Sequence, residues 1–398
     1  MAIAHIPYGA YWSTPFARWQ GAFAHLHSLQ FAAHVTRGAL ADRGLTPDLL
    51  DYVAYGYTVI QPGIFYGAPW FSALIGAEGL AGPTVNQACA TGPRLIATVA
   101  GEMALGNAAV ALVAAGDRLS NGAHVYYPAP AAPGGTGASE NWVMDSFNCD
   151  PWAQNAMVDT AENVARRDGI TTAEQHDLVV HRHAQYQQSL ADDRAFQRRY
   201  MADLDVPDAG FRKTLARISG DQGIQPVDPD KMARLKPVRD GGTVTFAGQT
   251  HPADGNAGMI LCADAGRAAE LARPGGPRVQ VLAVTQSRED KGFMPAAPIK
   301  ATRRALEQTG LAIAGIDAIK SHNPFAVNDI AFARAFGLDW RGMNNFGSSL
   351  IWGHPQGPTG LRGLIELIEE LETRGGGTGL FQGCAAGDSA LAVLVRVG

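Results

Sequence analysis

The chain has 398 residues, of which 46% are hydrophobic and 17% are charged, and it carries 47 glycines and a net charge of −5. This length and apolar content predict a folded α/β protein with large buried cores and exclude a disordered or coiled-coil protein. The weakly negative net charge is not that of a protein that binds nucleic acid or anionic membranes through a basic surface, so we expect neither as a partner.

The N-terminus lacks a basic segment followed by an apolar one, and the apolar stretch at residues 108–115 is far shorter than the ~20 residues that cross a bilayer. Four cysteines, Cys89, Cys149, Cys262 and Cys384, are spread far apart and form no Cys-x-x-Cys pair. The sequence therefore gives no support for a zinc ribbon or redox motif, and we predict no bound metal and no permanently bound cofactor. We expect a cytoplasmic protein with free thiols.

The first half begins with a predicted amphipathic helix around Arg37 that Gly44 ends, followed by an aspartate and a strand. Cys89 lies in Val85-Asn-Gln-Ala-Cys-Ala-Thr-Gly, directly before a helical pattern at residues 94–105, and residues 109–115 then form a predicted buried strand. A cysteine at a strand-to-helix turn faces the positive end of the helix, which favours a thiolate and a pKa below ~8.5. The alternative is a small buried side chain without a chemical role.

Residues 119–242 differ in composition from the segments on either side. Proline and glycine at 128–137 predict a loop, and residues 172–202 form a polar stretch with helical periodicity. A predicted strand at 258–263 returns to the first half, and a strand at 279–285 enters the second. We interpret 119–242 as an insertion.

The second half repeats features of the first at a nearly constant offset in the chain. The helix around Arg304, ended by Gly310, resembles the helix around Arg37, and Thr359-Gly resembles Thr91-Gly. Such a repeat indicates two similar halves with sheets covered on both faces.

Three further residues of the second half could carry chemistry. His322 ends a predicted strand, Cys384 follows another in a loop of small residues, and His354 lies in Gly353-His-Pro-Gln-Gly-Pro-Thr-Gly. His354 occupies the place in its repeat that Cys89 occupies in the first. If a pseudo-twofold relates the halves, the two loops meet, and a histidine beside a cysteine activates the thiol.

Together these motifs resemble the thiolase superfamily. Asn86-Gln-Ala-Cys-Ala-Thr-Gly is similar to its nucleophile motif, Gly353-His-Pro to its Gly-His-Pro motif, and Cys384-Ala-Ala-Gly-Asp to its C-terminal Cys-x-Gly-Gly-Gly stretch. The likeness runs from about residue 9 to the C-terminus. It implies the thiolase fold, an α/β fold with two similar halves in a layered αβαβα arrangement and an inserted loop domain. The expected division is 1–118 and 243–272 for the N-terminal half, 119–242 for the loop domain, and 273–398 for the C-terminal half.

The resemblance implies CoA-dependent cleavage of a 3-oxoacyl-CoA, or the reverse Claisen condensation, with coenzyme A as co-substrate. Cys89 would attack the keto carbon and become acylated, His354 would take its proton, and Cys384 would serve as acid and base. One oxyanion hole would come from backbone N–H groups near Cys89 and Gly387, and the other from His354 and the His322 loop.

Some positions depart from the common family pattern. His322-Asn-Pro-Phe stands where common thiolases have Asn-Glu-Ala-Phe and is closer to the His-Asp-Cys-Phe of sterol-carrier-type thiolases, so His322 would replace an asparagine that holds a water. Arg239 stands where an aromatic residue usually lines the CoA site. Met157, Thr250 and Phe325 occupy pantetheine-contact positions of the family.

Aromatic residues suggest the kind of substrate. They either pack the core and a dimer interface or line a pocket for a bulky or aromatic acyl group. These residues are Tyr57, Phe65, Tyr66, Trp70, Phe71, Trp142, Phe147 and Trp152.

The resemblance also implies a homodimer or a dimer of dimers, and some relatives work beside a small zinc-binding OB-fold subunit. Two other functions stay open. A ketoacyl-synthase-like or carbon-acylating condensing enzyme would suit the two histidines but would not need Cys384. A non-catalytic partner subunit would be expected to have lost the nucleophile or a base, and neither is missing here.

Overall fold

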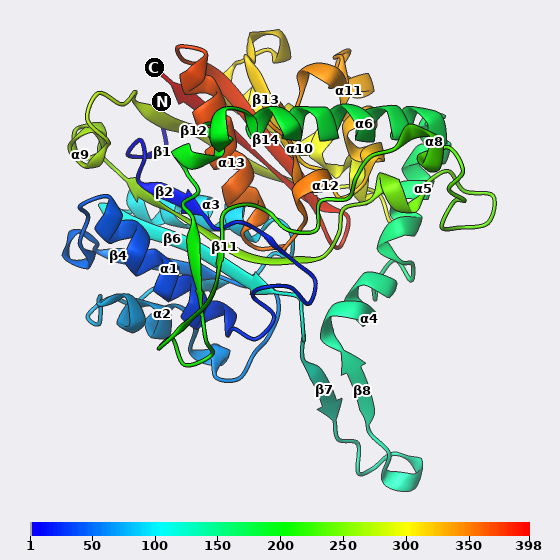
Figure 1. Cartoon of the computed structure of the whole chain (residues 1–398), viewed down its shortest axis with the longest axis horizontal. Helices are drawn as coiled ribbons and strands as arrows, with labels where there is room; N and C mark the ends of the chain where they lie inside the picture. The colour runs from blue at the N-terminus through cyan, green and yellow to red at the C-terminus, as the bar shows by residue number, and fades with distance from the viewer. Residues whose placement is uncertain (1) are drawn as a thin grey trace.

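The computed structural model describes residues 2–398, and its central mixed sheet consists of two matching parts (Figure 1). In each part a parallel pair is followed by two strands, each antiparallel to its neighbour, and the N-terminal part has one more parallel strand at its outer edge. The parts join where β1 pairs with β12, with Ala4 opposite Val281. The N-terminal order is β5 (Thr84–Val85), β4 (Tyr52–Gly56), β6 (Val110–Arg118), β11 (Ala253–Cys262) and β1 (Ala4–His5), and the C-terminal order is β13 (Ala318–His322), β14 (Gly377–Ala385), β15 (Ser389–Val397) and β12 (Val279–Arg288).

Helices cover both faces of each part, which gives the layered αβαβα arrangement. Along β6, Leu112 and Ala114 pack toward the outer helices α1 and α2, while Ala111 and Val113 pack toward the central helices α3 and α13. Both faces are therefore apolar, which is why the strand at 109–115 could be predicted from an uninterrupted apolar run. The layers contain α1 (Ser28–Asp42) and α2 (Gly67–Ile75), then α3 (Thr91–Ala104) and α13 (Thr359–Thr373), then α10 (Ala297–Thr309) and α11 (Ala326–Phe336).

The two central helices begin with the repeated Thr-Gly pairs and approach each other closely there. A Cβ atom at Gly360 would lie 2.4 Å from Pro93 Cδ, and one at Gly92 would lie 2.9 Å from the Leu361 backbone nitrogen. Only glycine permits this approach without displacing a helix. The contact brings together the loops that precede α3 and α13.

The inserted region contains two hairpins and several helices. Residues 128–137 form the end of the β7–β8 hairpin, which extends away from the body of the protein (Figure 1). The predicted helix at 172–202 is shorter than expected: α6 ends at Ser189 because Asp192, Asp193 and Arg194 have positive φ angles, which a right-handed helix cannot include. The elements are β7 (His124–Tyr127), β8 (Ala138–Asn141), α4 (Trp142–Asn148), α5 (Met157–Asp168), α6 (Thr172–Ser189), α7 (Ala191–Arg194), β9 (Leu204–Pro207), β10 (Thr214–Ile218) and α8 (Pro229–Met232).

Helices α5 and α6 pack against the C-terminal half (Figure 1). Helix α5 contacts α11, and α6 contacts α11 and α12, so the insertion covers these two helices. Within residues 2–398, no helix combines the length and the apolar character needed to cross a membrane. The remaining elements are β2 (Tyr11–Ser13) and β3 (Ala17–Arg18), which pair with β11, and α9 (Ala265–Leu271) and α12 (Ser349–Trp352).

Candidate active site

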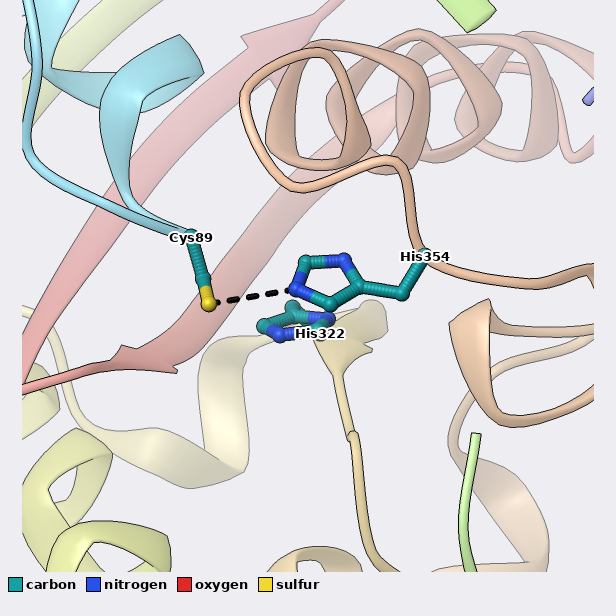
Figure 2. A group of neighbouring side chains, drawn as sticks. All are labelled: Cys89, His322 and His354. Atoms are coloured by element: carbon teal, nitrogen blue, oxygen red, sulfur yellow. Dashed lines mark hydrogen bonds between the residues drawn. The ribbon is translucent and has the colours of Figure 1, made fainter. Parts of the chain in front are cut away.

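Cys89 lies in a tight loop between β5 and α3. The preceding Ala88 has a φ of +46°, a backbone region that residues other than glycine rarely adopt. Thr91 holds this loop in place: its Oγ1 donates to the Ala88 carbonyl oxygen at 2.7 Å and accepts the Gln87 N–H at 2.9 Å. The strained loop thus has a fixed shape and presents the Cys89 sulfur toward the second half of the protein (Figure 2).

His354 lies in the loop between α12 and α13 and faces Cys89 (Figure 2). Its Nε2 is 3.1 Å from Cys89 Sγ, and its Nδ1 is 2.7 Å from Thr359 Oγ1. Thr359 is the repeat equivalent of Thr91, so the same residue of each repeat fixes the loop that carries a reactive side chain. Neutral His354 with its proton on Nδ1, toward Thr359, has a free lone pair for the Cys89 proton.

His322, the last residue of β13, lies against the His354 ring with centroids 4.0 Å apart and planes 30° apart (Figure 2). Its Nδ1 is 2.9 Å from Ser349 Oγ, whereas its Nε2 is buried without a hydrogen-bond partner. The Cys89 sulfur and one nitrogen of each histidine all lie within 4.8 Å of one another. No metal site was predicted, because these residues are far apart in the sequence.

Cys384 is the second-last residue of β14 and is buried, rather than lying in the loop after the strand as predicted. Asn328 Nδ2 donates a hydrogen bond to its sulfur at 3.2 Å. The same Asn328 accepts the Phe325 N–H at the start of α11, also at 3.2 Å. Its spacing from Phe325 is that of a helix-capping side chain, but nothing in the sequence links it to Cys384.

Ala386 and Gly387 lie in the turn between β14 and β15. The Ala386 N–H is near enough to Cys89 to act against the rise in the pKa of its thiol, and Ala386 lines the cavity described below. Gly387, which we expected in an oxyanion hole, lies one residue further on in the β14–β15 turn, where its carbonyl accepts from Arg288. The place of Gly387 near an oxyanion hole stays a prediction, and Ala386 beside it is a further candidate donor.

Asp117 is a site residue that the sequence analysis missed. Its buried carboxylate at the end of β6 accepts the N–H groups of Thr58, Val59 and Gly357. Gly357 belongs to the loop of His354, so Asp117 ties that loop to the N-terminal half. Burial raises the pKa of Asp117 to about 7, against the effect of these donors.

Burial controls the protonation of the reactive side chains. It raises the pKa of Cys89 to about 12, although N–H groups of Ala386 and Cys89 itself act in the opposite direction. Burial and the neighbouring His322 hold the pKa of His354 well below 6.5, and burial lowers the pKa of His322 to about 3. The expectation of a lowered thiol pKa is wrong, because desolvation outweighs the helix terminus. The resting site holds a thiol and neutral imidazoles.

Both halves of the chain match models of known protein families. Residues 10–265 match the family described as "Thiolase, N-terminal domain", and residues 276–397 match "Thiolase, C-terminal domain". This chain belongs to the thiolase family. It is an acyltransferase by that membership, and its relatives are similar over nearly their whole length.

Among these relatives, the beta-ketothiolase BktB of Cupriavidus necator is 27% identical over 392 residues, covering 96% of both chains. The acetyl-CoA acetyltransferase of Escherichia coli is 26% identical, again covering 96% of both. The crystal structure of human mitochondrial 3-ketoacyl-CoA thiolase has a TM-score of 0.90 over 100% of both chains at 23% identity, which shows that the thiolase fold is shared.

In this thiolase-family protein, Cys89 and His354 lie at the bottom of a cavity of about 550 Å³. Its wall includes all four residues expected to contact CoA, of which Arg239 pairs with Asp159 at 2.5 Å. The four are Met157, Thr250, Phe325 and Arg239, and lining residues that the sequence did not suggest are Val238, Phe246, Gln249, Pro324 and Gln356.

Only two of the eight aromatic residues suggested for an acyl pocket line this cavity, namely Trp142 and Phe147. Phe71 is fully buried in the core of the first half, and Phe65 and Tyr66 are 89% and 71% exposed. The unusual segment 65–71 therefore does not build the pocket. The remaining three, Tyr57, Trp70 and Trp152, also lie outside the cavity wall.

Proposed function

We propose that the protein catalyses CoA-dependent cleavage of a 3-oxoacyl-CoA, or the reverse Claisen condensation, through an acyl-Cys89 intermediate. The observation that carries this proposal is the 3.1 Å contact between Cys89 Sγ and His354 Nε2 beneath a cavity of suitable size. Burial raises the pKa of a second thiol, Cys384, and a negative charge on the nearby Cys89 would raise it further. The names of the relatives, a beta-ketothiolase and acetyl-CoA acetyltransferases, support the same reaction class.

In the first half-reaction, the Cys89 thiol gives its proton to His354 Nε2 as its sulfur bonds to the keto carbon. Because the resting pair is neutral, this transfer accompanies attack instead of preceding it. The bond between the α-carbon and the former keto carbon then breaks. The enolate that leaves takes the Cys384 proton and departs as acetyl-CoA, leaving the shortened acyl group on Cys89 and a Cys384 thiolate.

In the second half-reaction, the Cys384 thiolate takes the proton of an incoming CoA thiol. The CoA sulfur attacks the acyl-Cys89 carbonyl, and Cys89 leaves and recovers its proton from His354. Asn328 Nδ2, which donates to Cys384 Sγ, would stabilise the thiolate between the two steps.

Charge on the two carbonyl oxygens needs separate donors. We assign the acyl oxygen to the N–H groups of Cys89 and Ala386, both of which act in the direction that lowers the pKa of the Cys89 thiol and so stand near its sulfur. The enolate oxygen is assigned to His322 Nε2, whose burial without a partner leaves it free. To donate there in the substrate complex, His322 carries its proton on Nε2, and the Ser349 hydroxyl turns from Asn323 Oδ1, to which it donates at 3.2 Å in the free protein, to donate to His322 Nδ1.

The cavity supports a substrate with a bulky or aromatic acyl group. Trp142 and Phe147 supply apolar surface at its wall, and Arg239 supplies a cation at 46% side-chain exposure, suited to a CoA phosphate. Met157, Thr250 and Phe325 would border the pantetheine arm between these ends.

The test mixes purified protein with short, long and aromatic 3-oxoacyl-CoAs plus CoA, and follows products and intact protein mass together. We expect acyl-CoA release and a transient acyl adduct on Cys89. Cys89→Ala should lose both, while Cys149→Ala, which removes an exposed thiol, should keep both. Turnover by Cys89→Ala would overturn the proposal.

A second candidate is a ketoacyl-synthase-like or carbon-acylating condensing enzyme. The proximity of both His322 and His354 to Cys89 favours it, since such enzymes pair a cysteine with two polar partners. Release of CO₂ from malonyl-CoA by the wild-type protein, with no cleavage of 3-oxoacyl-CoAs, would select this alternative. A non-catalytic partner subunit would bind CoA thioesters but form no adduct.

We further propose a homodimer or dimer of dimers in the cytoplasm, divided at the boundaries given in the sequence analysis. The exposed aromatic pair Phe65 and Tyr66 supports self-association, and four free cysteines support a reducing compartment. A small zinc-binding OB-fold subunit remains an additional proposed partner. Light scattering of the protein, alone and after co-purification, tests the assembly.

A further inference from the structure

We infer that Cys89, His322 and His354 form a binding site for a borderline-soft divalent cation such as Zn²⁺, and that the bound ion blocks the nucleophile. The three donors come from three separate elements: the loop before α3, the end of β13 and the loop before α13 (Figure 2). One sulfur and two imidazole nitrogens are the donors that Zn²⁺ takes in proteins with an open fourth position.

The separations between the donors are close to those of a tetrahedral ion. Bond lengths of roughly 2.3 Å to sulfur and 2.0–2.1 Å to nitrogen place neighbouring donors about 3.3–3.6 Å apart. The Cys89 Sγ to His354 Nε2 distance is 3.1 Å, and the most distant pair is within 4.8 Å. Coordination therefore requires movement of about 1 Å, which a tilt of the His322 ring away from its stacked arrangement supplies.

The imidazole nitrogens that would not bind the ion each contact a hydroxyl group, which orients the ring. Thr359 Oγ1 lies 2.7 Å from His354 Nδ1, and Ser349 Oγ lies 2.9 Å from His322 Nδ1. Ser349 Oγ also donates to Asn323 Oδ1 at 3.2 Å. Its single hydrogen is then used, so it accepts the proton of His322 Nδ1. In this tautomer His322 presents a bare lone pair at Nε2.

The bare nitrogen is the independent sign of a missing ligand. His322 is 1% exposed, and its Nε2 has no hydrogen-bond partner. His354 Nε2 presents a second lone pair beside it, toward the Cys89 sulfur. The Nε2 lone pairs of the two histidines and the lone pairs of the Cys89 sulfur face one another. Because lone pairs repel one another, this arrangement is stabilised by a proton or a cation between them.

Binding involves no change of oxidation state. The Cys89 thiol releases its proton to solvent, a sulfur–metal bond forms, and the two imidazole nitrogens bind through their lone pairs, with water at the fourth position. The donor set favours Zn²⁺, Co²⁺ or Ni²⁺ over Mg²⁺ and Ca²⁺, which prefer oxygen ligands. An occupied Cys89 sulfur cannot attack an acyl group, so the ion acts as a reversible inhibitor of the function proposed above.

The test titrates reduced, chelator-treated full-length protein with Co²⁺ and follows the thiolate-to-cobalt charge-transfer band, with Zn²⁺ displacing the cobalt. We expect one ion per chain, loss of the band in Cys89→Ala, and retention in Cys149→Ala. His322→Asn should weaken binding more than Ser349→Ala, which removes only an orienting hydroxyl and should cost about 10–100-fold. Circular dichroism confirms that each variant is folded.

A second readout is the alkylation of Cys89 by iodoacetamide, which Zn²⁺ should slow and a chelator should restore. Equal cobalt affinity in wild type, Cys89→Ala and His322→Asn would overturn the inference, as would the absence of a charge-transfer band in wild type. Because both readouts measure binding and not turnover, failure of the metal site and failure of the proposed acyl transfer give different results.

Discussion

Replacing Gly360 by alanine tests whether the contact between α3 and α13 holds Cys89 and His354 together. The added Cβ would lie 2.4 Å from Pro93 Cδ and 2.8 Å from Pro93 Cγ, whereas ordinary contact begins at 3.4 Å. A proline ring cannot rotate away, so the helices must separate by about 1 Å. Overpacking of this kind costs about 1–3 kcal/mol, against a gain of roughly 1 kcal/mol from alanine in a helix interior.

The same separation moves His354 away from Cys89. Their 3.1 Å contact would lengthen toward ~4 Å, beyond a hydrogen bond, and a misplacement of about 1 Å at a reacting pair costs on the order of 100-fold in rate. The assays are urea unfolding and the rate of Cys89 acylation. The matched control is Gly101→Ala in α3, where a Cβ meets nothing within 4 Å and should add about 0.5–1 kcal/mol. If Gly360→Ala retained full stability and acylation, the contact would not be what positions the pair.

Four other substitutions give separate tests. Asn328→Ala removes the donor to Cys384, so kcat should fall by about tenfold or more with KM nearly unchanged in steady-state assays; an unchanged kcat would contradict the role of Asn328. Asp117 has a pKa raised to about 7 from 3.8, so its contribution to stability is complete below about pH 4 and is lost as pH rises through 7, by up to about 4 kcal/mol. Asp117→Asn should flatten urea unfolding midpoints between pH 5 and 8, and an equally steep profile would refute the assignment. Arg239→Ala should raise the KM for CoA several-fold with kcat retained, whereas loss of kcat alone would argue against phosphate binding. Trp142→Ala should lower kcat/KM for aromatic acyl substrates by about 10–100-fold and for short ones much less; equal losses would exclude a role in acyl selectivity.

The repeat in the sequence predicted the central feature of the structure. Thr91-Gly and Thr359-Gly mark equivalent helix starts, and two equivalent helices packed together bring the preceding loops, with Cys89 and His354, to one place. Short motifs were sufficient here because the chemistry lies immediately before each helix and its position follows from the helix start.

Other features depend on contacts that a linear pattern does not contain. The pKa of Cys89 follows mainly from the desolvation of its sulfur among residues far apart in the chain, and this effect is opposite to the one expected from the helix terminus. Which backbone N–H groups stand near the Cys89 sulfur depends on the shape of the turn between β14 and β15. Asn328 and Asp117 contact the site across long sequence separations, so no local signal identifies them.

The division of the site between the two halves also determines when the protein becomes reactive. His354 follows Cys89 by 265 residues in the chain, so the proposed nucleophile is synthesised long before its proposed base. During that interval the thiol has neither a proton acceptor nor the cavity that admits a thioester. Acyl transfer can therefore begin only when the second half has folded onto the first, and a truncated or misfolded chain carries an ordinary cysteine thiol instead of an unregulated acylating centre.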